Sequence, residues 1–301
     1  MTAGQHHEDS TVALSIAPPP WRRLVAIGAE FLRSRLATGG LILVAIMVGS
    51  AALAPLLSAY APEAMDYTAI LQPPSWAHLF GTDELGRDIF SRSLYGARLS
   101  LAVGVGAVLL AASIGIPLGL IAGYKGGWLD AVFMRILDSL MALPPLVLAL
   151  TISAVLGSGL VNATVAIAIV SVPTFARLIR GQVLSLKHHE FVQAAESVGV
   201  RTVLIIFRHI LPNAVNPAIV QASLAIGFAI ILESSLSFIG LGAQPPASTW
   251  GSMVQVGFQY LEIAPWYPLI PATLIFIAVL SFNLFGEGLR QLLDPAARTR
   301  G

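Results

Sequence analysis

Long apolar runs limit what this chain can fold into more than any other feature of its sequence. A transmembrane α-helix needs about 20 largely apolar residues. Six stretches are long enough: 41–61, 99–124, 132–157, 160–179, 217–239 and 269–289. Hydrophobic residues make up 56% of the 301 residues and charged residues only 11%, a composition typical of a membrane protein. We therefore expect an all-α, polytopic membrane protein with about six transmembrane helices.

The basic residues predict the orientation of these spans. Of the 17 Lys and Arg residues, only Arg87, Arg92 and Arg98 lie in segments assigned to the outside. The outside segment at 240–268 contains an acid, Glu262, and no Lys or Arg. By the positive-inside rule, both termini face the cytoplasm. The expected division is a cytoplasmic tail at 1–37, a first span with an external segment at 38–97, a five-span core at 98–290 and a cytoplasmic tail at 291–301.

An unusually charged loop, residues 188–213, interrupts the apolar sequence between the fourth and fifth spans. Four of its side chains recur at the spacing of one helix face: Phe191, Ala194, Ala195 and Val198. Gly199 follows where a left-handed residue would end that helix. A second apolar run, 203–211, is too short to cross a bilayer and is expected to stop at Pro212. Periodicity alone favours a solvated pair of short helices as much as a functional loop.

The same loop resembles the cytoplasmic Glu-Ala-Ala loop of ABC importer permeases. In that family the loop contains a coupling helix that docks into a cleft on a separate ATPase subunit. This sequence departs from the pattern with Gln193 in place of Glu and with His209 at a hydrophobic position. The resemblance implies a coupling role for Glu190, Gln193, Ala194, Ala195, Gly199, Leu211 and Pro212.

A second motif lies in the expected external segment, in residues 80–98, FGTDELGRDIFSRSLYGAR. Thr82 or Asp83 is a candidate N-cap for a helix here. The pattern resembles a signature of the C-type subunit of dipeptide and oligopeptide permeases and of their nickel-importing relatives. Its residues are Gly81, Thr82, Asp83, Gly86, Arg87 and Asp88. A run at 236–251, with LSFIGLG, QPP and WG, strengthens the match. Judged without the family, the acids of the motif are as well explained by a solvated surface.

Glu233 is an acid deep in the span expected at 217–239, and Ser234 follows it. Because a carboxylate exposed to lipid costs several kcal/mol, Glu233 should face a cavity or another helix. Two explanations remain open: both side chains line a translocation path, or Glu233 is a structural acid between helices.

Two further patterns occur within the spans. Gly115, Gly119 and Gly123 repeat every four residues, which is expected to allow close packing of two helices. Asp138 and Glu287, nearer to span ends, each have an Arg three residues away as a possible helical partner. The possible pairs are Arg135 with Asp138 and Glu287 with Arg290.

Missing motifs narrow the function. Neither Lys125 nor Lys187 follows a glycine in a phosphate-binding loop, so the chain is not expected to be the ATPase. The sequence has no cysteine, and its six histidines form no metal-ligand pattern with nearby carboxylates. We expect no catalytic residues, no metal site and no cofactor of its own. A net charge of +1 gives no indication of nucleic-acid binding.

The motifs together identify the chain as resembling a C-type permease subunit of a binding-protein-dependent ABC importer. That resemblance implies half of a translocation pathway for dipeptides or oligopeptides in a bacterial inner membrane. The implied partners are a homologous permease, two ATPase subunits that bind ATP and Mg²⁺, and an external solute-binding protein. A nickel or other small-solute importer is the alternative within the family. An ion-coupled carrier is the alternative outside it, although such a carrier should show several intramembrane acids.

Overall fold

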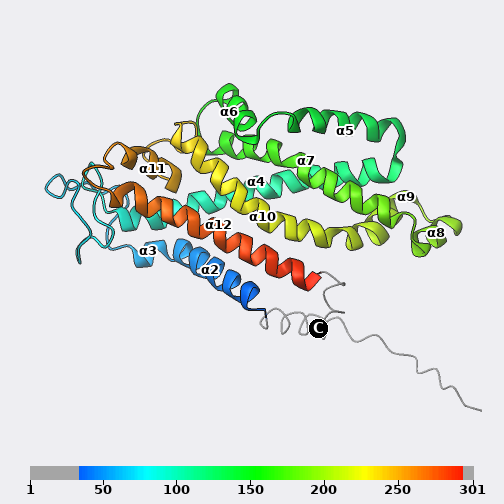
Figure 1. Ribbon diagram of the computed structural model, residues 1–301, viewed down its shortest axis with the longest axis horizontal. Coiled ribbons are helices and arrows are strands. Elements are labelled where there is room, and N and C mark those ends of the chain that lie inside the picture. The colour runs from blue at the N-terminus through cyan, green and yellow to red at the C-terminus, as the bar shows by residue number, and fades with distance from the viewer. Residues whose placement is uncertain (1–33, 294–301) are drawn as a thin grey trace, which may run out of the picture.

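The computed structural model describes residues 34–293, and these form a bundle of long helices (Figure 1). Five helices run along the length of the bundle: α2 (Arg35–Ala52), α4 (Ile89–Lys125), α7 (Leu160–Leu186), α10 (Leu211–Phe238) and α12 (Trp266–Leu293). The shorter helices are α3 (Ala54–Leu57), α5 (Gly127–Met141), α6 (Pro145–Leu156), α8 (Glu190–Ser197), α9 (Thr202–Leu204), the π-helix η1 (Ile205–Ile210) and α11 (Trp250–Phe258). The predicted all-α fold is confirmed. Most of the two predicted tails, 1–37 and 291–301, lies outside the described residues.

The described helices include five that are long and apolar enough to cross a membrane, counting α9, η1 and α10 as one. The third expected span, 132–157, is not one straight helix, because α5 and α6 meet at an angle of 93°. Pro144 and Pro145 lie at the break. Proline has no N–H to donate and disfavours helix at the residue before it. The predicted six spans are therefore reached only if this bent pair counts as one.

The expectation that the apolar run at 203–211 stops at Pro212 is wrong. The π-helix η1 continues directly into α10, so the second half of the loop is the beginning of the fifth span. Pro212 occupies the first turn of α10, where a missing N–H is tolerated. A proline there starts a helix rather than ending one.

Glycines let α4 and α7 pack closely, as their spacing predicts. A Cβ at Gly115 would lie 2.8 Å from Cβ of Phe175, and one at Gly123 would lie 2.8 Å from Cβ of Val183. A Cβ at Gly119 would overlap the carbonyl oxygen of Ala176. The three glycines therefore place two helix backbones in direct contact within this chain.

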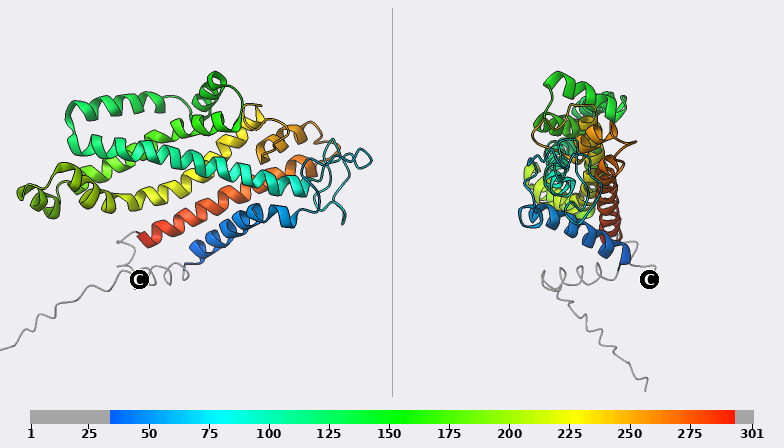
Figure 2. Two further views of the ribbon diagram at one scale, coloured as in Figure 1. Left: turned by 180° about the vertical axis from the view of Figure 1, so that it is seen from behind. Right: turned by 90° about the vertical axis from the view of Figure 1, so that its left-hand side faces the viewer.

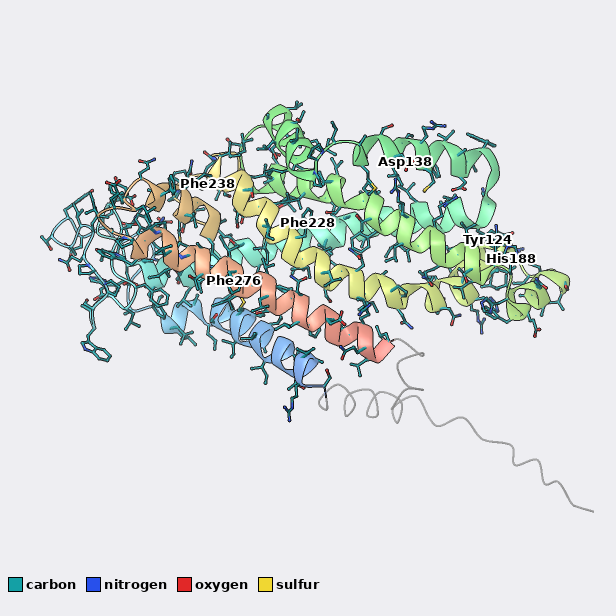
Figure 3. The ribbon with its side chains drawn as sticks, in the orientation of Figure 1. Tyr124, Asp138, His188, Phe228, Phe238 and Phe276 are labelled. Atoms are coloured by element: carbon teal, nitrogen blue, oxygen red, sulfur yellow. The ribbon has the colours of Figure 1, made fainter. Side chains whose placement is uncertain are left out.

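Ion pairs between helices correct one of the two expected pairings. Asp138 on α5, labelled in Figure 3, pairs with Arg177 on α7 rather than with its neighbour Arg135. On the same two helices, Arg180 donates to both carboxylate oxygens of Asp130 at 2.5 and 2.7 Å. A pair three residues apart on one helix is worth only about 0.2–0.5 kcal/mol, so a partner on an adjacent helix easily replaces it. The other expected pair, Glu287 with Arg290, is present at 2.9 Å.

The bundle has two distinct ends. One end holds the segment at 58–88 together with α11, at the left of Figure 1. The opposite end holds α8 and the turn between α4 and α5, as the reverse view in Figure 2 also shows. We call these the signature end and the loop end. Arg87 and Arg92 lie at the signature end, whereas Lys125 and Lys187 lie at the loop end.

Candidate functional site

The loop predicted to couple to a partner begins with α8, and Gly199 ends that helix as the sequence predicts. Gly199 has φ +76°. Its N–H donates to the carbonyl of Glu196 at 2.9 Å, and the N–H of Val200 donates to the carbonyl of Ala195 at 3.0 Å. These two bonds are the Schellman arrangement, which satisfies the last carbonyls of a helix. At the other end of α8, the carboxylate of Glu190 in the first turn complements the helix dipole.

The inner face of α8 packs on its own chain. Val192 is completely buried and Ala195 is 8% exposed. Their neighbours in this cluster come from α4, α7, η1 and α10: Leu120, Ile179, Val183, Ile205, Ile206, Ile210, Ala214 and Ala218. The cluster fixes the orientation of α8 relative to the long helices.

The outer face of α8 is apolar and open to solvent. Phe191 is 41% exposed and Val198 is 80% exposed, and the small side chain of Ala194 lies exposed between them. Phe207, in η1, adds a further exposed apolar side chain at 59%. The helix face expected from the sequence is therefore divided, because Ala195 points inward while the other three members point outward. We call Phe191, Ala194 and Val198 the outer face of α8.

Polar contacts attach α8 to the rest of the loop end. The hydroxyl of Tyr124, at the end of α4, donates to Oε1 of Glu196 at 2.7 Å; Figure 3 places Tyr124 and His188 at this end. Gln193 donates from Nε2 to the carbonyl of His188 at 3.2 Å, so the residue that departs from the family pattern has a local role. Tyr124 cannot be predicted from the loop sequence, since nothing in the spacing of the loop points to a residue about 70 positions earlier.

The end of the predicted loop lies at the start of α10. Leu211 packs against the same buried cluster as Val192, and Pro212 is exposed in the first turn. The π-helical turn η1 lies between α8 and this point. Wide turns of this kind are uncommon and frequently accompany functional sites.

The signature residues at the other end form a network centred on Asp83. Oδ1 of Asp83 accepts the backbone N–H groups of Leu85 and Arg87, both at 2.9 Å. Oδ2 pairs with the guanidinium of Arg87 at 2.6 Å and with that of Arg92 at 3.3 Å. The Asp83 side chain is completely buried. A buried carboxylate is stable only with such compensation, so Asp83 is part of the structure rather than of a solvated acidic surface.

Two further acids of this segment connect it to helices. Glu84 accepts from Arg87 at 2.7 Å and from the hydroxyl of Tyr267 on α12 at 2.6 Å. Asp88, and not Thr82 or Asp83 as expected, is the N-cap of α4, because its Oδ2 accepts the N–H of Ser91 at 2.7 Å. The expected caps lie in the preceding turn, where Thr82 donates its hydroxyl proton to the carbonyl of Ala69.

The glycines of the signature are required by the backbone. Gly81 has φ +76° and Gly86 has φ +70°, a region that favours glycine. At Gly86 a Cβ would also overlap the carbonyl of Asp66, and at Gly81 it would lie 2.6 Å from the carbonyl of Gln72. The motif Gly-Thr-Asp-x-x-Gly-Arg-Asp is thus a compact turn that presents the start of α4.

Glu233 is completely buried between α10, α4 and α11. Its Oε1 accepts the hydroxyl of Ser237 at 2.7 Å, and its Oε2 accepts that of Ser100 at 3.4 Å. Ser100 in turn accepts the N–H of Trp250 at 3.3 Å. Ser234 borders a different space, a cavity of about 440 Å³ between α6, α10, α11 and α12. The two residues predicted to line a path therefore do not face the same space. The surroundings of Glu233 are those of a structural acid.

Comparison with known families identifies the chain. Residues 115–299 match the family described as the binding-protein-dependent transport system inner membrane component. This protein belongs to that family. Residues 20–74 match a second family, the N-terminal transmembrane domain of oligopeptide transport permease C. The chain is thus a membrane permease subunit of the importer class, and family membership decides against the ion-coupled carrier.

Relatives of this permease span nearly its whole length. It is 46% identical to the dipeptide transport system permease protein DppC of Alkalihalophilus pseudofirmus, over 97% of this chain and 94% of that protein. It is 45% identical to the glutathione transport system permease protein GsiD of Pectobacterium atrosepticum, over 93% and 92%. A probable D,D-dipeptide permease, DdpC of Escherichia coli, is 46% identical over 85% and 86%. Among solved structures, the inward-facing MetNI methionine ABC transporter has the same fold, with a TM-score of 0.57 at 18% identity, over 68% of this chain and 97% of that one.

No group of three or more His, Asp or Glu side chains in residues 34–293 is placed to hold an ion.

Proposed function

We propose that this permease forms half of the translocation pathway of a bacterial peptide importer. The named relatives act on a dipeptide, on glutathione and on D,D-dipeptides. All three substrates are short peptides or peptide-like molecules, which supports a peptide in preference to nickel or another small solute. The remaining assembly is proposed to be a homologous permease, two ATPase subunits and an external solute-binding protein. ATP and Mg²⁺ would be bound by the ATPase subunits, and this chain would need no cofactor.

The outer face of α8 is the observation that carries this proposal. A short helix held at its inner face by a buried cluster, with apolar side chains exposed on the other face, is suited to insertion into a groove of a partner. Glu190, Gln193 and Ala194 lie exposed on this helix, and Val198 extends the surface. Gly199 ends α8, and Leu211 and Pro212 begin α10.

Movement of a docked α8 would reach the long helices through two contacts. Val192 and Ala195 pack on α7 and η1, and Glu196 is bonded to Tyr124 at the end of α4. When ATP closes the ATPase subunits, displacement of α8 would therefore move α4 and α7, which glycines hold in direct contact. In this proposal the spans alternate between inward-open and outward-open states. The protein would lie in the bacterial inner membrane, with the loop end and both termini in the cytoplasm.

The proposed path lies where the broken span meets α7 and α10. A cavity of about 350 Å³ there is lined by polar as well as apolar side chains, among them Ser171, Thr174 and Gln221. Ser234 borders the second cavity toward the signature end. Glu233 would contribute to this path only indirectly, by fixing α10 against α4.

Uptake measurements test the proposal. In cells that lack their own peptide importers, co-expression with the genes of the proposed partner subunits should restore accumulation of labelled dipeptide in a manner that requires ATP. Nickel accumulation without dipeptide accumulation would contradict the peptide assignment. Ion-driven uptake by the purified chain alone would contradict the importer assembly.

A further inference from the structure

A cavity at the signature end is lined by arginine side chains whose positive charge is only partly balanced by the carboxylates of the signature network. Its volume is about 320 Å³, and it lies between α4, the segment after α3 and the loop before α11. Among the residues that line it are Pro62, Glu63, Arg92, Tyr95 and Arg98. None of the proposed coupling or path residues is among them.

Arg92 is the buried cation of this cavity, with a side chain only 8% exposed. Its Nε lies 3.3 Å from Oδ2 of Asp83, but that oxygen is held more closely, at 2.6 Å, by Arg87. Its Nη1 donates to the backbone carbonyl of Pro62 at 3.3 Å. One carboxylate oxygen thus serves two guanidinium groups, and Arg92 receives the weaker share.

Arg98 supplies a second cation. Among the described residues it has no carboxylate partner, and its guanidinium carbon lies 5.7 Å from the centre of the Tyr95 ring. Glu63 borders the cavity but forms no ion pair with either arginine in the described part of the chain. Two guanidinium groups facing one cavity are suited to an oxyanion, which accepts hydrogen bonds from both.

The position of Arg98 along α4 favours a lipid headgroup over a soluble oxyanion as the ligand. Residues 99–124, which follow it on α4, contain no charged side chain, so Arg98 lies where the apolar part of the helix begins. An Arg and a Tyr at this position are typical of the boundary between the bilayer and water.

An exposed apolar face continues from Arg98 along α4. Ala102, Val105 and Leu109 follow at four, seven and eleven residues, which places them on the same side of the helix. Val105 is 37% exposed and Leu109 is 65% exposed. Acyl chains of a lipid would cover this face, whereas a small soluble oxyanion has no apolar chain to lie against it.

The geometry therefore assigns a phospholipid site to the signature end of α4. The phosphate lies between Arg92 and Arg98, and the acyl chains follow Ala102, Val105 and Leu109 into the bilayer. Tyr95 packs beside the glycerol backbone at the boundary. This site is separate from the proposed transport path and does not depend on which solute is carried.

Native mass spectrometry of the full-length chain, purified in a mild detergent and titrated with phosphatidylglycerol, tests the site. Arg98→Gln should weaken binding about tenfold, the usual effect of losing one charge-assisted hydrogen-bond pair. Arg98→Lys keeps the charge but lacks the planar guanidinium, so its lipid affinity should lie between those of the natural chain and Arg98→Gln. Lys125→Gln removes one positive charge from the opposite end of the same helix and is the matched control, with binding unchanged.

A second variant keeps the test decisive if Arg98→Gln fails to insert. Glu63→Gln removes the one carboxylate that lines the cavity and should tighten lipid binding. Glycerol phosphate has the same charged group without acyl chains and should not compete. Equal competition by glycerol phosphate, or displacement of lipid by a dipeptide, would overturn the assignment. Equal lipid binding by Arg98→Gln, Lys125→Gln and the natural chain would also overturn the assignment. If Arg98→Gln in addition no longer co-purified with its partner permease, the cavity would belong to a subunit interface instead.

Discussion

The hydroxyl of Tyr124 donates a 2.7 Å hydrogen bond to Oε1 of Glu196, and this bond joins the end of the long helix α4 to the short helix α8. The two residues lie at the loop end of the bundle, where Val192 and Ala195 of α8 belong to a buried apolar cluster that includes residues of α7 and η1. A displacement of α8 would therefore reach two long helices rather than one.

Tyr124→Phe should separate coupling from docking. The substitution removes one hydrogen bond, worth about 1 kcal/mol, and leaves the outer face of α8 unchanged. We expect the ATPase subunits to co-purify normally while uptake per ATP hydrolysed falls about fivefold. Tyr67→Phe, which removes an exposed hydroxyl at the signature end, is the control. Unchanged uptake in Tyr124→Phe would show that this bond transmits nothing.

The outer and inner faces of α8 should respond differently to added volume. Ala194→Leu enlarges an exposed side chain on the outer face of α8, the proposed docking surface, and should lower ATPase co-purification without changing thermal stability. Ala195→Leu enlarges a side chain that is 8% exposed against the buried cluster, and overpacking there should cost about 1–3 kcal/mol. Pull-down normalised to membrane level, together with thermal unfolding in detergent, distinguishes the two. Identical profiles for both variants would contradict the division of the helix into two faces.

Gly199 should be intolerant of β-branched residues for a conformational reason only. A Cβ at Gly199 would meet no heavy atom within 4 Å, but φ is +76°, and a side chain there costs about 1 kcal/mol or more. Gly199→Val should therefore reduce ATPase co-purification and uptake. Gly199→Asn should retain more of both, because Asn adopts this conformation more readily. The control is Gln193→Glu, on the exposed side of α8, which should be tolerated. Full ATPase co-purification and uptake in Gly199→Val would show that coupling does not require the left-handed residue that ends α8.

Asp83→Asn should destabilise the signature end. The carboxylate is buried and serves two backbone N–H groups and two guanidinium groups. Removing one partner of a buried ion pair typically costs about 3–5 kcal/mol. We expect a lower melting temperature and less protein in the membrane. The control is Glu262→Gln, at an exposed acid of the same end, which should behave like the natural chain. Equal melting temperatures for Asp83→Asn and Glu262→Gln would contradict the prediction.

Cysteine labelling tests the orientation, using a natural chain that contains no cysteine. Ser197→Cys at the loop end should be shielded from an impermeant thiol reagent in intact cells, and Glu262→Cys at the signature end should react. Glu262 is exposed, whereas Ser248, in the same segment predicted to lie outside, is only 8% exposed and is a poorer probe. Labelling of Ser197→Cys from outside would reverse the proposed topology.

Local patterns in the sequence were sufficient for much of this protein. Apolar length predicts the spans, because a helix that crosses a bilayer must satisfy its own backbone and present apolar side chains along about 20 residues. The spacing of Gly115, Gly119 and Gly123 predicts close helix packing, and Gly199 predicts the end of α8, because both properties depend on residues near in sequence. The family resemblance of the loop and of the signature is local in the same sense.

The tertiary structure alone decided which residues are partners. Ala195 faces inward and Ala194 outward because α7 and η1 lie on one side of α8. Asp138 pairs with Arg177, and Glu233 with Ser100, because helices distant in sequence are adjacent in space. Periodicity defines a helix face but not what that face contacts, since the energy of burying a charge or an apolar side chain depends on the surrounding elements.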